Sequence, residues 1–63
     1  MKHWLVSFAT IQNNTVVEEA EIIVEAATIG VALNKAYKEI HDMVLDGYQF
    51  TIWNIGIIED DIL

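Results

Sequence analysis

Bulky apolar residues alternate with small or polar residues in the first half of the chain. In residues 4–11 the large side chains fall on even positions: Trp4, Val6 and Phe8. In residues 19–25 apolar side chains again fall on even positions, and most odd positions hold glutamate. A period of two residues places each set on one face of a β-strand. The pattern predicts a β-hairpin with its turn around Asn13 and Asn14.

The length of the hairpin loop decides which side chains meet across the two strands. A strict two-residue turn would place Phe8 opposite Glu19, whereas a loop one residue longer would place Phe8 opposite Ala20. Burial favours the second register, because it keeps glutamate off the apolar face. We therefore expect a loop of three or more residues, with a bulge and a left-handed Asn14.

Apolar residues recur at three- and four-residue spacing after Thr28, which predicts an amphipathic helix. The stripe consists of Ile29, Ala32, Leu33, Ala36, Tyr37, Ile40, Met43 and Val44. Thr28 is the expected N-cap, since its hydroxyl can accept a bond from a free backbone N–H. Gly47 is the expected left-handed residue at the C-cap.

Residues 48–58 predict a third strand, which completes a ββαβ pattern. On strict alternation Tyr48, Phe50, Ile52 and Ile58 share one face, and Trp53, Ile55 and Ile57 share the other. A right-handed crossover through the helix returns the chain beside the first strand. We expect residues 1–63 to form a single α+β domain. Its three-stranded antiparallel sheet has the order two, one, three, with the helix across one face.

The second face of this sheet is expected to be apolar and uncovered. Its apolar members are predicted to be Leu5, Ala9, Ile11, Ile23, Trp53, Ile55 and Ile57, with carboxylates of the second strand on the same face. A contiguous apolar patch usually marks an interface, and a core in a chain of this size is marginal. We therefore expect another chain to cover the patch, most simply as a homodimer; the alternative is a monomer of marginal stability.

Composition narrows the possible partners. Ten carboxylates against three lysines give a net charge of −7, so we expect no direct nucleic-acid binding, because little is available to neutralise phosphates. The hydrophobic content of 54% excludes a disordered acidic tail. The longest uncharged run, residues 47–58, is too short to span a bilayer. Residues 4–11 alternate as a strand does and not as a signal peptide, so we expect a cytoplasmic protein without membrane contact.

Catalytic chemistry has little support in the sequence. His3 and His41 are the side chains expected to titrate near neutrality, and no motif brings them together. The chain has no cysteine, so a metal site would need both histidines and carboxylates from Glu59, Asp60 or Asp61. We find no nucleophile motif and no phosphate-binding loop. We therefore expect no catalytic residue, no cofactor and no metal.

The glutamates of the second strand form a more specific candidate site. Glu19, Glu21 and Glu25 are expected on one face, and residues two apart on a strand are about 6.7 Å apart. Such a row can imitate phosphates and occupy a basic groove on another protein. The simpler interpretation is that the negative surface keeps an apolar protein soluble.

The succession of hairpin, cap, helix and strand resembles that of short phage and mobile-element accessory proteins. The resemblance covers most of the chain and is carried by residues 23–28 and the alanine-bearing helix at 32–40. It implies a non-enzymatic protein that blocks a host defence or nucleic-acid-processing factor, as anti-CRISPR-like inhibitors do. The chain departs from this class in the apolar helix start Ile29-Gly30-Val31.

Three functions therefore remain open. The chain could be an acidic inhibitor that binds a basic protein surface through Glu19, Glu21 and Glu25. It could be an assembly module that associates through its apolar sheet face, in which Trp53, Ile55 and Leu5 contribute most. It could also hold a small molecule between protomers, although it lacks cationic groups for an anionic ligand.

Overall fold

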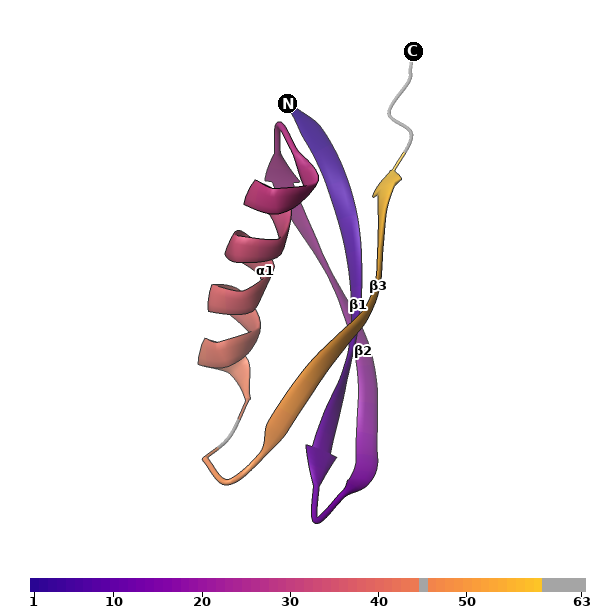
Figure 1. Cartoon of the computed structure of the whole chain (residues 1–63), viewed down its shortest axis with the longest axis vertical. Coiled ribbons are helices and arrows are strands. Elements are labelled where there is room, and N and C mark those ends of the chain that lie inside the picture. The colour runs from indigo at the N-terminus through magenta and orange to yellow at the C-terminus, as the bar shows by residue number, and fades with distance from the viewer. Residues whose placement is uncertain (45, 59–63) are drawn as a thin grey trace.

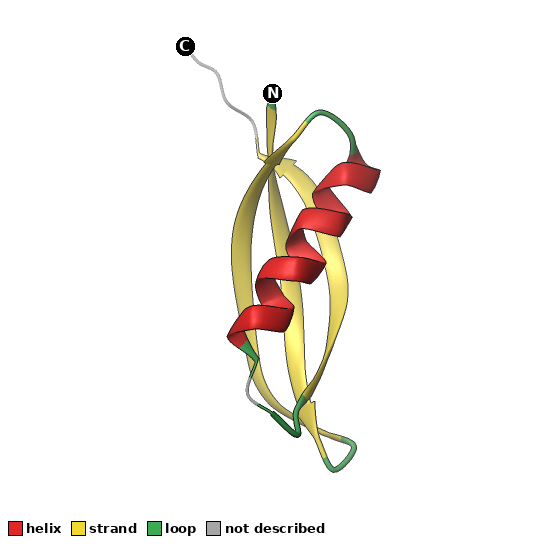
Figure 2. Ribbon diagram, turned by 90° about the vertical axis from the view of Figure 1, so that its left-hand side faces the viewer, coloured by secondary structure: helices red, strands yellow, loops and turns green. Residues whose placement is uncertain are grey.

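Three antiparallel strands and one helix form the predicted ββαβ arrangement. The computed structural model describes residues 1–44 and 46–58. The elements are β1 (Lys2–Gln12), β2 (Thr15–Ala26), α1 (Ile29–Met43) and β3 (Gln49–Ile58). The strand order β2-β1-β3 and the placement of α1 on one side of the sheet confirm the predicted fold (Figures 1 and 2). Over the part of the chain that is described, no helix combines the length and apolar character needed to cross a membrane.

The sheet has two faces of different character. We call the face under α1 the covered face and the opposite one the open face. The even-numbered side chains of β1 point into the core on the covered face, together with three residues of α1 spaced four apart. The core consists of Trp4, Val6, Phe8, Val24, Ala26, Ala32, Ala36 and Ile40. Two of the three buried helix residues are alanines, which lets the helix backbone lie close to the sheet. The rest of the predicted apolar stripe is less buried, and Ile29, Tyr37 and Met43 are at least half exposed.

The two strands of the hairpin pair in the predicted register, but the loop between them is shorter than predicted. Phe8 pairs with Ala20, as predicted. However, the loop is a two-residue turn in which both Asn13 (φ 54°) and Asn14 (φ 60°) are left-handed. That combination is typical of the tight turns that match strand twist. A bulge in β2 at Val17, next to the Thr10–Glu18 pair, supplies the extra residue. The predicted bulge and left-handed Asn14 are confirmed, and the predicted longer loop is wrong.

A second bulge changes the face on which the end of β3 lies. Phe8 pairs with Ile52 but Ser7 pairs with Asn54, so Trp53 is the extra residue. Beyond it, Ile55 pairs with Val6 and Ile57 with Trp4. Directly opposed residues share a face. The prediction that Ile55 and Ile57 lie on the open face is therefore wrong, and Ile55 packs against the core instead.

The N-terminus of α1 is as predicted from the sequence, but its C-terminus is not. The Thr28 hydroxyl accepts a hydrogen bond from the Val31 backbone N–H at 3.4 Å, which confirms the predicted N-cap. The helix ends earlier than predicted, at Met43, and Val44 is its extended C-cap. Gly47 is left-handed (φ 89°) but lies in the turn before β3. The prediction that it caps the helix is wrong.

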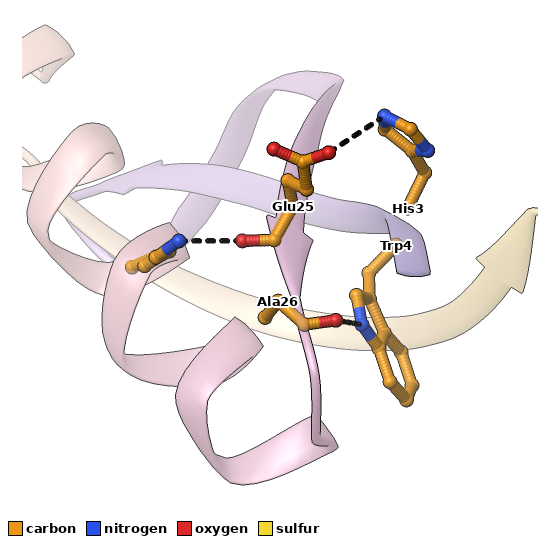
Figure 3. Close-up of polar contacts among 5 residues, drawn as sticks. His3, Trp4, Glu25 and Ala26 are labelled. Carbon is orange, nitrogen blue, oxygen red and sulfur yellow. Dashed lines mark hydrogen bonds and ion pairs between the residues drawn. The ribbon is translucent and has the colours of Figure 1, made fainter. Parts of the chain in front are cut away.

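Two side chains tie the end of β2 to its neighbours (Figure 3). The buried Trp4 indole Nε1–H donates to the Ala26 carbonyl oxygen at 3.0 Å. The Lys35 ammonium of α1 donates to the Glu25 carbonyl oxygen at 2.6 Å. Trp4 thus provides core volume and also satisfies a backbone acceptor where the last strand residues lead into the helix.

Candidate functional site

The open face is formed by the odd-numbered residues of β1 and their partners on either side. Along β1 these are His3, Leu5, Ser7, Ala9 and Ile11; on β2 they pair with Glu25, Ile23, Glu21, Glu19 and Val16; on β3 they pair with Ile58, Gly56, Asn54, Thr51 and Gln49. α1 lies on the other side of the sheet (Figure 1). These carboxylates of β2 therefore lie on the same surface as Leu5, Ile11 and Ile23.

Small residues at the centre of the open face are buried although no helix covers them. Ser7 is 2% exposed and Ala9 is 5% exposed. Glu19, Ala20, Glu21 and Trp53 line one shallow pocket of about 300 Å³. Because Trp53 comes from β3 and the glutamates from β2, this pocket reaches across β1, which lies between them. The alternation of β1 predicts Ser7 and Ala9 on this face, but it does not predict that they are buried there.

We call this pocket the acidic–aromatic pocket; its members are Glu19, Ala20, Glu21 and Trp53. Both glutamates are exposed, and within residues 1–44 and 46–58 neither forms an ion pair. Trp53 is 60% exposed, so the indole remains accessible from solvent. Two carboxylates beside an accessible aromatic ring form a negatively charged and partly apolar surface, which suits an organic cation.

Glu25 is separate from this pair. Its carboxylate Oε2 lies 3.6 Å from His3 Nε2, a contact that becomes an ion pair when the imidazole is protonated (Figure 3). Ile23 lies between Glu25 and Glu21 on the same face of β2. The predicted row of three carboxylates is therefore a pair over the pocket, with a third carboxylate beside a histidine at the end of the sheet.

The apolar residues of the open face differ in part from the predicted ones. Ile23 is 57% exposed and pairs with the half-buried Leu5. Ile11 is half-buried farther along β1, and Trp53 lies between these two regions. Ile55 and Ile57 are on the covered face. Val16, opposite Ile11, and Ile58, opposite His3, lie on the open face instead.

The two histidines lie on different elements, each near one carboxylate. His41 lies on α1, where its Nδ1 is 4.0 Å from the exposed Asp42 carboxylate, and His3 is on β1 beside Glu25. In the described residues no group of three or more metal-binding side chains comes together. The sequence hypothesis that joined the histidines to Glu59, Asp60 or Asp61 involves residues outside those described.

Comparison with known proteins adds no further information on this site. The chain matches none of the protein families, curated proteins or solved structures with which we compared it.

Proposed function

We propose that this chain is a small acidic, non-catalytic protein-binding module that uses its open face. The observation that carries the proposal is the acidic–aromatic pocket, in which two exposed glutamates of β2 share a cavity with the exposed Trp53 of β3. The ligand that this combination suits is a lysine or arginine side chain of the partner. Ile23 and Leu5 provide apolar contact beside it.

The chemistry of the pocket favours a cation over a neutral group. A guanidinium or ammonium group over the face of an indole is attracted by the ring quadrupole, by about 0.5–2 kcal/mol depending on desolvation. Hydrogen bonds from that cation to a carboxylate are charge-assisted and are stronger than neutral ones. Tryptophan and charged anchors of this kind supply most of the energy of many interfaces.

The charge of the whole chain supports a basic partner. At −7 the chain repels nucleic acid at long range and attracts a basic protein surface. Residues two apart on a strand, such as Glu19 and Glu21 on β2, are separated by about 6.7 Å along the strand. This is close to the rise along the DNA helix axis over two phosphate steps of one strand, about 6.8 Å. We therefore propose that the chain binds in the nucleic-acid-binding groove of another protein and thereby inhibits that protein.

The test uses charge reversal at the pocket with a matched control. The double variant Glu19→Lys/Glu21→Lys reverses both pocket carboxylates, and Glu39→Lys/Asp42→Lys makes the same charge change on the exposed side of α1. Partners are recovered from the source cell with the unmodified chain, and one is purified for affinity measurement. We expect the pocket variant to lose at least ten-fold in affinity and the helix variant to change little. Equal losses in the two variants, or none in either, would contradict the proposal.

A further inference from the structure

The two edges of the sheet differ in charge. The outer strand β2 carries four glutamates, whereas β3, the other outer strand, has no charged residue in Gln49–Ile58. Charged side chains are a common means of preventing strand-to-strand association at a sheet edge. By this criterion the β2 edge is protected against association with another strand, and the β3 edge is not.

The bulge at Trp53 limits how much of the β3 edge is regular. A bulge itself disfavours pairing locally, which leaves the stretch Asn54–Ile58 beyond it. On the covered face of this stretch, Ile55 is partly buried and Ile57 is more than half exposed. An apolar side chain is thus left accessible beside an uncharged edge.

Gly56, at the centre of this stretch, has no role that the fold of one chain explains. Its φ is not positive, and a Cβ added there would meet no atom within 4 Å. Glycine inside a strand weakens it and often marks a close approach of another backbone. Inside one chain nothing described makes that approach.

We infer that a second copy of this chain pairs with β3 in antiparallel fashion, centred on Gly56. In this register Gly56 faces its own copy, and Ile55 of one chain faces Ile57 of the other on the covered face. No charged side chains oppose each other within the paired stretch, whereas the same pairing through β2 would bring glutamates together. A strand edge that is compatible with itself is what a two-fold interface requires.

This pairing has a consequence for the open face. Antiparallel pairing of one edge with itself sets the two-fold axis normal to the sheet, so both open faces point the same way. The two β2 strands become the outer edges of a six-stranded sheet, about 24 Å apart at the usual strand spacing. Two acidic–aromatic pockets would then lie on one surface, which permits two-site binding.

The first test is the mass in solution, by light scattering on a sizing column at low and high salt. We expect about 14 kDa, twice the 7.1 kDa of one chain, at both salts. Gly56→Lys should return the mass to that of one chain, because two ammonium groups would meet at the axis. The control Ile23→Lys introduces a lysine in the same cross-strand row at the other edge of the sheet. This variant should remain dimeric. A single-chain mass for the unmodified protein at its highest soluble concentration would overturn the inference.

The second test locates the contact and does not depend on how well the lysine variants fold. The chain has no cysteine, so Gly56→Cys would introduce a single thiol. Directly opposed residues of an antiparallel pair have Cα atoms about 4.5–5.5 Å apart, within the range that a disulfide spans. We expect Gly56→Cys to form a covalent dimer on mild oxidation and Ile23→Cys to form little. Cross-linking at residue 23 instead, or equally at both positions, would overturn the inference.

Discussion

The covered and open faces of the sheet are made from the same three strands but bury different side chains. On the covered face Val6 and Ile40 are completely buried among apolar neighbours. On the open face the buried residues are the small Ser7 and Ala9, and the larger Trp53 and Ile23 remain more than half exposed. The comparison indicates that the covered face holds the fold together, whereas the open face leaves large side chains accessible to solvent. Changes on the two faces should therefore have separable effects.

The largest effect is expected in the centre of the covered face. Ile40→Ala removes a fully buried side chain, and such changes cost about 2–5 kcal/mol of unfolding free energy. In a chain this small that is most of the stability. Urea unfolding followed by circular dichroism measures it. Met43→Ala on the same helix, where the side chain is 56% exposed, should cost under about 1 kcal/mol. Similar losses in the two variants would contradict the assignment of Ile40 to the core.

The two tryptophans provide a matched pair across the sheet. Trp4→Phe keeps an aromatic ring in the core but removes the Nε1–H donor to the Ala26 carbonyl. Leaving that acceptor without its donor should cost about 1–3 kcal/mol. Trp53→Phe on the open face should change stability by less than about 0.5 kcal/mol. Thermal unfolding of both variants makes the comparison, and a greater loss for Trp53→Phe would show that the open face also stabilises the fold.

Deletion of the bulge residue Val17 tests what determines the face on which each β2 residue lies. Deleting Val17 would let Thr10 and Glu18 pair without a bulge directly after the two-residue turn, with every downstream residue on its present face. We expect a folded protein whose unfolding free energy changes by about 1 kcal/mol or less. Amide spectra that show the Phe8–Ala20 pairing would confirm the retained register. An unfolded variant would mean that the bulge itself is required.

The smallest stability effect is expected for charge reversal on the open face. Glu19→Lys/Glu21→Lys changes two exposed side chains without ion pairs in the described part of the chain. Stability should stay within about 0.5 kcal/mol of the unmodified protein, although partner binding is lost. Denaturant midpoints of the two proteins should nearly coincide. A large shift would mean that any loss of binding reports a damaged fold.

The fold could be predicted from the sequence because hydrophobic periodicity and capping determine it. Even-numbered β1 residues, the Thr28 cap and the crossover were enough to give element order and strand order. The bulge at Trp53 was not predicted, and the bulge in the hairpin was predicted together with a longer loop that does not form. A longer loop and a two-residue turn with a bulge give the same pairing of Phe8 with Ala20, and alternation alone does not distinguish them.

The candidate site could be predicted only in parts. Glu19, Glu21 and Trp53 were all predicted for the second face of the sheet, but they were assigned to two separate candidate sites. The missing information was the bulge, which shifts Ile55 and Ile57 to the covered face and leaves Trp53 beside the glutamates. Imperfect alternation in residues 48–58 was the available signal. It becomes informative only when the β1–β3 register is known.

The most direct test of the central claim is whether the acidic–aromatic pocket binds a cationic side chain. N-acetyl-arginine amide, titrated at millimolar concentrations, serves as the probe, and the neutral citrulline analogue serves as its control. The indole N–H signals of Trp53 and of the buried Trp4 are followed by NMR. We expect arginine to shift the Trp53 signal and leave Trp4 unchanged, with a weaker shift in Glu19→Gln/Glu21→Gln and none from citrulline. No shift of Trp53, or equal shifts with arginine and citrulline, would contradict the account.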